Sequence, residues 1–151
     1  MSQYIYFIIP VLVGIGVGVQ SGANTQLSFY LKSPLQAALI SFATGTLFLI
    51  LVNLFRGGII PDWEQAAKTR WWMWSGGMLG TFFITSVILI APKIGPARLF
   101  GIIIASQLIF SIVIDHFGLL GFNVQPINLK KIIGAVLLIV GAILIQSSKS
   151  S

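Results

Sequence analysis

Five long apolar runs, separated by short clusters of polar, proline and glycine residues, dominate the pattern of this chain. A membrane-spanning helix needs about 20 predominantly apolar residues, and each run is long enough to supply them. The pattern therefore predicts an all-α membrane protein, with one five-span domain over residues 1–151. We place the spans at about 4–22, 35–55, 71–91, 97–115 and 130–146, with a possible extension of the first to residue 30 and a short interfacial helix at about 62–69.

The fourth run carries a polar stripe in an otherwise apolar sequence. Gln107, Ser111 and Asp115 recur at every fourth residue, which places them on one face of a helix. At a rise of roughly 1.5 Å per residue from Ala97, Gln107 lies about 15 Å along the helix. That depth is near the middle of a hydrocarbon core about 30 Å thick, so the amide should face protein or water. Two interpretations stay open: the stripe holds helices together, or it lines a solute pathway.

The first run combines a glycine stripe with a polar one. Three glycines spaced four residues apart predict a close-packing helix face: Gly14, Gly18 and Gly22. Gln20 and Asn24 form a polar stripe at the same spacing. Measured from Tyr4, Gln20 lies about 24 Å along the helix, near the far edge of the membrane core. The two side chains are therefore either ordinary interfacial polar groups or hydrogen-bonding partners of a solute.

Small residues recur at helix-packing spacing in the other spans as well. The predicted packing positions there are Ser41, Gly45, Gly76, Gly80, Gly134 and Gly141. At the end of the fourth run, Asp115 and His116 are adjacent, so on a helix they point in different directions and make a poor catalytic dyad. They are either an interfacial helix cap or a proton-responsive gate, because histidine titrates near neutral pH.

Composition narrows the class of protein further. The 151 residues are 56% hydrophobic and only 8% charged, whereas soluble domains carry roughly a quarter charged residues. The net charge of +6 does not indicate nucleic-acid binding, because nearly all Lys and Arg flank the apolar runs and can meet lipid phosphates. With no cysteine and one histidine, we expect no metal site and no cofactor. We also expect no enzyme, since no nucleophile, base and orienting group recur at helical spacing.

The cations that flank the spans are nearly balanced between the two membrane sides. Five lie on the side of the N-terminus and four on the other: Arg56, Lys68, Arg70, Lys130 and Lys131 against Lys32, Lys93, Arg98 and Lys149. The positive-inside rule orients a protein through a difference in this count. We therefore hypothesise that the chain inserts in both orientations and pairs as an antiparallel homodimer, which reproduces the inverted repeat of transporters. Both Gln107 side chains would then lie near the midplane, and the two Gln20 side chains near opposite faces.

Six motifs follow one another along almost the whole chain: Gly16-x-x-x-Gln20-x-x-x-Asn24-x-x-Leu27, Ser33-Pro34-x-x-Ala37-Ala38-x-x-Ser41-Phe42-x-x-Gly45-Thr46, Trp72-x-Trp74-x-Gly76-Gly77-x-x-Gly80, Ala91-Pro92-x-x-Gly95, Gln107-x-x-x-Ser111-x-x-x-Asp115-His116-Phe117-Gly118 and Gly134-Ala135. In this order the sequence resembles the YdcZ-like inner-membrane exporters of the drug/metabolite transporter superfamily. The resemblance implies a five-helix unit equivalent to half of a ten-helix transporter. It also implies residence in the bacterial inner membrane and pairing with a second copy or a close relative, but it implies no substrate.

Three functions stay open at this point. The first is a secondary transporter that exports a small metabolite or drug-like solute, with hydrogen bonds to the solute from Gln20, Asn24, Gln107 and Ser111 and a gating or proton-coupling role for Asp115 and His116. The second is a flippase for a lipid-linked amphiphile, and the third is a non-transporting assembly subunit whose polar stripes only pack helices. The related small multidrug exporters carry a membrane-embedded glutamate in their first span. This chain has none there, so we do not expect it to bind permanent cations through a buried anion.

Overall fold

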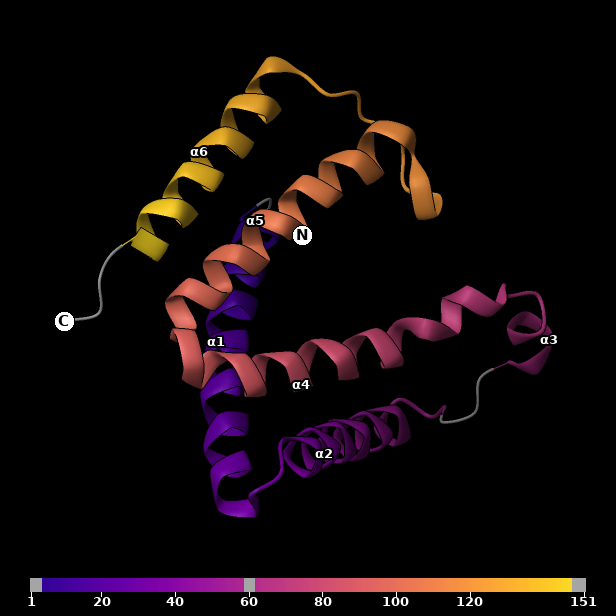
Figure 1. The fold of residues 1–151 in the computed structure, drawn as a ribbon. Helices are drawn as coiled ribbons and strands as arrows, with labels where there is room; N and C mark the ends of the chain where they lie inside the picture. The colour runs from indigo at the N-terminus through magenta and orange to yellow at the C-terminus, as the bar shows by residue number, and fades with distance from the viewer. Residues whose placement is uncertain (1–3, 59–61, 148–151) are drawn as a thin grey trace. The chain divides into compact units, whose positions relative to one another are not determined.

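Helices make up all the regular structure in the part of the chain that the computed structural model describes, residues 4–58 and 62–147. In order they are α1 (Ile5–Leu31), α2 (Pro34–Phe55), α3 (Trp63–Ala66), the 3₁₀ helix η1 (Trp71–Ser75), α4 (Gly76–Ile94), α5 (Pro96–Phe117), the 3₁₀ helix η2 (Leu119–Gly121) and α6 (Leu129–Ser147) (Figure 1). Five stretches are long and apolar enough to cross a bilayer: Ile8–Leu31, Pro34–Phe55, Trp71–Ile94, Pro96–Phe117 and Leu129–Ser147. The predicted all-α fold with five membrane-spanning helices is confirmed for the described residues.

The chain divides into two compact units, Met1–Pro92 and Lys93–Ser151. The first unit holds α1, α2, α3 and nearly all of α4, and the second holds α5 and α6. Lys149, which entered the count of flanking cations, lies outside the described residues.

The first span is longer than its predicted core of residues 4–22, because nothing ends the helix at Gly22. α1 runs on through Asn24 to Leu31, within one residue of the predicted extension to residue 30. In lipid, a helix satisfies its own backbone groups, so isolated polar side chains do not break it. The helix ends at Lys32, whose left-handed backbone (φ 53°) lets its N–H donate to the carbonyls of the preceding turn.

The turn into α2 is fixed by capping. The Ser33 hydroxyl accepts a hydrogen bond from the Gln36 backbone N–H at 3.3 Å, which satisfies one of the free donors at the start of a helix. Pro34 occupies the first turn, where a missing N–H costs nothing. The second span therefore begins close to its predicted start at residue 35.

Small residues at the start of α2 let the helices of the first unit meet. Ala37 is fully buried, and Ala38 and the α4 residue Ile88 are only 2% exposed. Three partly buried side chains pack against this cluster: Leu27 and Leu31 from α1, and Ile84 from α4. An alanine side chain ends at Cβ, so helix backbones can approach closely at these positions. The cluster lies beside the α1–α2 turn and holds the spans of this unit together there.

The segment between the second and third spans contains a shorter helix than the predicted 62–69. α3 covers only Trp63–Ala66 and is capped by the Asp62 carboxylate, which accepts from the N–H groups of Glu64 (3.0 Å) and Gln65 (3.4 Å). The third span starts at Trp71 as predicted, but its first turn is the 3₁₀ helix η1. There the Trp74 indole N–H donates to the Thr69 hydroxyl at 2.8 Å.

The second unit is a hairpin of α5 and α6, which run side by side (Figure 1). α5 follows Gly95 (φ 87°) and ends at Gly118 (φ 61°), two backbone conformations that glycine adopts without strain. At Gly101, an added Cβ would lie 3.8 Å from the Cα of Ala142, so the two helices pack closely at this point. The predicted spans 97–115 and 130–146 correspond to α5 and α6 within two residues at each end.

Candidate functional site

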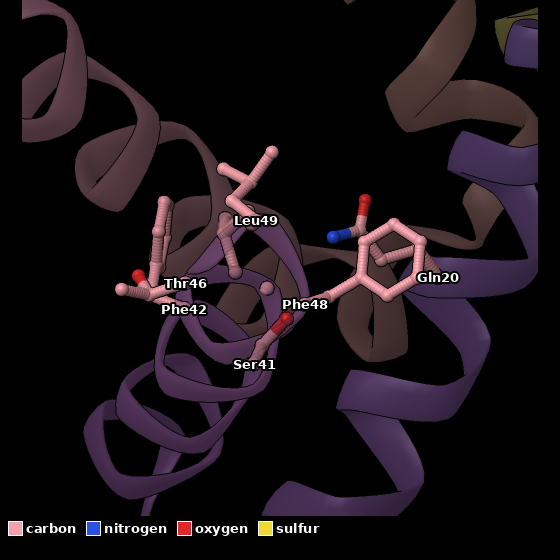
Figure 2. A pocket seen from close by; sticks show the side chains of 8 residues that line it. Gln20, Ser41, Phe42, Thr46, Phe48 and Leu49 are labelled. Atoms are coloured by element: carbon pink, nitrogen blue, oxygen red, sulfur yellow. The ribbon is translucent and has the colours of Figure 1, made fainter. Parts of the chain in front are cut away.

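A pocket of about 390 Å³ opens among the three long helices of the first unit. Most of its lining comes from α2, with Gln20 from α1 and Ile84 from α4; the α2 residues are Ser41, Phe42, Gly45, Thr46, Phe48 and Leu49. Figure 2 shows the Gln20 side chain extending from α1 towards α2, so that its amide group reaches into the space between them. The six α2 positions follow the spacing of one helix face.

The polar groups of this pocket are only partly engaged. Asn24, 7% exposed, donates from Nδ2 to the Ser41 hydroxyl oxygen at 3.2 Å and thereby joins α1 to α2. Ser41 is left with its own hydroxyl proton to donate. Among the described residues, the Gln20 amide and the Thr46 hydroxyl make no hydrogen bond. Since lipid offers no hydrogen bonds, these groups are available to water or to a solute in the pocket.

Gln20 lies deeper in its span than the sequence analysis placed it. The membrane-spanning stretch of α1 is Ile8–Leu31, so Gln20 is roughly 18 Å from one end and 17 Å from the other at about 1.5 Å per residue. The predicted position near the far edge of the core was measured on the shorter span that ends at residue 22; on the longer stretch that α1 supplies, Gln20 lies near the middle. Gln107 lies roughly 16 Å from the start of α5, near the middle of its span, as predicted.

The polar stripe of α5 splits into two parts. Gln107 and Ser111 are exposed, and their side chains have no hydrogen-bond partner among the described residues. Asp115 instead forms an ion pair with Lys131 of α6, with Oδ2 and Nζ 3.3 Å apart. The structure thus gives the end of the stripe a partner inside the hairpin and leaves its middle uncovered by α6.

The loop between α5 and α6 is fastened to the Asp115–His116 end of α5. The Asp115 backbone carbonyl accepts from the Gln125 N–H at 2.7 Å, and His116 Nδ1 accepts from the Ile127 N–H at 3.2 Å. Lys131 Nζ also donates to the Gln125 carbonyl at 3.2 Å. An Nδ1 that accepts must carry no proton, so protonation there would remove this contact. The geometry favours the cap interpretation of Asp115 and His116, and the gating role stays a prediction.

The glycines that the sequence analysis assigned to helix packing differ in their surroundings. A Cβ on Gly80 would lie 3.3 Å from Cζ of Phe42, so Gly80 makes room for a ring that lines the pocket. A Cβ at the remaining positions would meet nothing within 4 Å: Gly14, Gly18, Gly22, Gly45, Gly76, Gly134 and Gly141. Gly45 and Ser41 line the pocket, and Gly141 lines an apolar groove of the α5–α6 hairpin. In the described part of their own unit, these glycines contact no neighbouring helix, so a role in helix packing would require a partner helix from outside that unit.

Five pocket residues were absent from the predicted site: Phe42, Thr46, Phe48, Leu49 and Ile84. Phe42 and Thr46 stand within the motif around Ser41 and Gly45, so their spacing on one helix face was a usable signal. Phe48 carried no such signal, because exposed phenylalanines are frequent on lipid-facing helices. Conversely, the predicted residues Gln20 and Asn24 both belong to this region, whereas Gln107 and Ser111 lie in the second unit.

Comparison with known proteins agrees with this architecture. The family model described as "Putative inner membrane exporter, YdcZ" matches residues 5–144. "Inner membrane protein YdcZ" of Escherichia coli (strain K12) is 29% identical over 145 residues, which cover 96% of this chain and 97% of that protein. No solved structure matches the chain. The chain is a multi-pass protein of the bacterial inner membrane and belongs to the YdcZ family of inner membrane exporters.

Proposed function

We propose that the chain is a secondary transporter that exports a small metabolite or drug-like solute by alternating access, as an antiparallel homodimer. The observation that carries the proposal is the pocket of the first unit, which presents the unpaired Gln20 and Thr46 groups near the middle of apolar spans. Polar groups at membrane depth are costly in lipid and usually mark a substrate pathway. A membrane transporter of an exporter family has a use for such a pocket, whereas pure helix packing would leave it unexplained.

Four side chains are assigned to the solute in this proposal. Gln20 donates and accepts hydrogen bonds directly, and Asn24 acts through Ser41, whose hydroxyl it orients. Two exposed side chains of α5 complete the pathway in the dimer: Gln107 near the middle of the span and Ser111 one turn closer to its end. Asp115 and His116 act at one mouth, where they hold the loop that precedes α6.

Three features support the pairing of two copies. The exposed middle of the α5 stripe needs a polar or aqueous surface to face, because an uncovered amide in lipid is costly. The α1 glycines present a bare surface suited to a closely approaching helix. The five-to-four balance of flanking cations gives no strong preference for one orientation. Two inverted five-helix copies would together make the ten-helix arrangement on which alternating access depends.

Transport by the purified protein tests the function. Metabolite profiling of a deletion strain supplies candidate solutes, and counterflow into proteoliposomes measures their movement. We expect Gln107→Leu to reduce transport severalfold, whereas Gln36→Leu, which makes the same change in the first turn of α2, should not. Full transport by Gln107→Leu would contradict the assigned site. Movement of lipid-linked substrates alone would show a flippase, and no movement of any solute would favour an assembly subunit.

Orientation is tested separately from transport. Tags at the N- and C-termini, probed from each side of the inner membrane, should both be accessible from both sides in a fixed ratio. One orientation for every chain would refute the antiparallel homodimer, and it would leave pairing with a related chain of opposite orientation to be sought.

A further inference from the structure

The pocket of the first unit contains no group that could neutralise an ion. None of its eight lining residues is charged. The spans around it, residues 5–31, 34–55 and 71–92, contain no Asp, Glu, Lys or Arg at all. An ion held there would lose its hydration without gaining a counter-charge from this unit, which is strongly unfavourable. The pocket therefore selects against both cations and anions.

The apolar part of the pocket consists of flat and branched side chains. Phe42 and Phe48 come from α2, together with Leu49, and Ile84 comes from α4. A Cβ on Gly80 would lie 3.3 Å from Cζ of Phe42, so the glycine leaves room for this ring. Two phenylalanine rings favour a planar partner, because aromatic rings attract one another in offset or edge-to-face geometry. At about 390 Å³ the pocket is at the small end of the range for ligand sites, which is about 300–1,000 Å³.

The polar part offers hydrogen bonds of both kinds. The Gln20 amide has two N–H donors and one carbonyl acceptor, and the Thr46 hydroxyl can donate or accept. Ser41 is different, because Asn24 already occupies its oxygen as a donor at 3.2 Å. Its hydroxyl proton therefore remains available to another acceptor. A solute with one hydroxyl, carbonyl or amide group on its edge can be satisfied by this set.

We propose that this pocket binds an uncharged solute with one or two rings and at least one hydrogen-bonding substituent, and that Thr46 and Gly45 set its specificity. The assignment rests on the proposed transport function for its biological meaning, and on the pocket alone for its chemistry. Thr46 supplies an unshared hydroxyl. Gly45 supplies space, because a Cβ there would meet nothing within 4 Å.

Binding to the full chain in lipid nanodiscs tests the ligand class, with empty nanodiscs subtracted to remove partition into lipid. Three bicyclic probes of similar size differ mainly in charge: 2-naphthol is neutral, N-methylquinolinium is a cation and 2-naphthoate is an anion. We expect saturable binding of 2-naphthol at least about tenfold tighter than that of either ion. The saturated analogue decahydro-2-naphthol should bind more weakly than 2-naphthol, because it cannot stack on a phenylalanine ring.

Matched variants locate the binding to this pocket. Thr46→Val should weaken 2-naphthol binding about threefold to tenfold by removing one hydrogen bond. Thr44→Val makes the same change two residues away, where the hydroxyl is bonded to the Ile40 and Ser41 carbonyls of its own helix, and should have no effect. Gly45→Leu should abolish binding by filling the pocket, since its Cβ would meet nothing within 4 Å. Ala43→Leu adds bulk at an exposed α2 position outside the lining and should leave binding unchanged.

Three results would overturn the inference, provided that each variant elutes as a folded protein in the same dimeric or monomeric peak as the wild type. These are an ion that binds as tightly as 2-naphthol, wild-type affinity in both Thr46→Val and Gly45→Leu, and no saturable binding of 2-naphthol to the wild type. Proteoliposome transport separates this inference from the proposed function. Binding in the expected pattern with no transport of any solute refutes the function and supports the ligand class. Transport of a charged solute that Gly45→Leu leaves intact refutes the ligand class and supports the function.

Discussion

Replacing Gln20 by leucine should weaken transport without lowering stability. Gln20 makes no hydrogen bond within the described chain, so the substitution removes no internal contact of the amide. Leucine at the centre of a span favours membrane insertion by about 0.3–0.6 kcal/mol. Because the unfolded chain also lies in lipid, this insertion term is nearly the same in both states, so the free energy of unfolding should stay the same within a few tenths of a kcal/mol. A lost hydrogen bond to the solute is worth about 0.5–1.5 kcal/mol, which corresponds to an apparent affinity about twofold to tenfold weaker.

Asn24→Ala is the contrasting variant. Asn24 is buried and donates to Ser41 at 3.2 Å. Hydrogen bonds between membrane helices average about 0.6 kcal/mol and reach about 1.7 kcal/mol. This substitution should therefore lower both stability and transport, because it loosens α1 from α2 and frees the Ser41 hydroxyl.

The assay pairs counterflow in proteoliposomes, over a range of solute concentrations, with thermal unfolding in the same lipid. We expect Gln20→Leu to raise KM with unchanged or higher thermal stability, and Asn24→Ala to impair both. If Gln20→Leu lowered stability by 1 kcal/mol or more, Gln20 would be a packing residue that contacts a second copy. If it changed neither quantity, the amide would have no role in the pocket.

Other regions of the chain give three further predictions. Gly118→Ala should destabilise the α5–α6 loop by about 1–2 kcal/mol, because φ is 61° and the new Cβ would lie 2.7 Å from Val124 Cγ2. Limited proteolysis at the loop should become faster, and an unchanged rate would contradict the loop geometry. A double-mutant cycle of Asp115→Asn and Lys131→Gln, measured by unfolding, should give a coupling free energy of about 0.2–1 kcal/mol, since both side chains are partly exposed. Additive effects would mean that the ion pair contributes nothing to stability. Ile88→Ala should lower the free energy of unfolding by less than the about 2–5 kcal/mol seen in soluble cores, because in the unfolded state the side chain still lies in lipid. Unfolding in the bilayer measures this free energy. A decrease at the top of that range would show that the substitution removes more than packing contacts.

The five spans could be predicted from the sequence because lipid imposes a strict rule on length and apolar character. The end of α1 was left open between residues 22 and 30, since the stop signal is the left-handed backbone of Lys32 and not any residue near Gly22. The depth of Gln20 was measured on the shorter alternative, which places it nearer the end of the span than the longer one does. A helix end that depends on one backbone conformation leaves little trace in hydrophobic pattern.

Only part of the candidate site could be predicted from the sequence, for a related reason. Gln20 and Asn24 stand out because polar residues are rare in apolar runs. Phe48 does not stand out, and its place in the pocket depends on how α1 and α4 pack on α2. Likewise, the partners of Asp115 and His116 come from a loop and a following helix, at Ile127 and Lys131, and no helical spacing connects them.

Cross-linking between copies tests most directly whether two inverted chains face each other. The chain contains no cysteine, so Gln107→Cys introduces one thiol per chain near the middle of α5. In an antiparallel pair the two thiols meet near the midplane. A short bifunctional maleimide applied to membranes should therefore convert most of the protein to a covalent dimer. As a control, a cysteine at the exposed position Gln36 should not cross-link. Only monomer from Gln107→Cys, in protein that a lipid-soluble maleimide labels fully, would contradict the account.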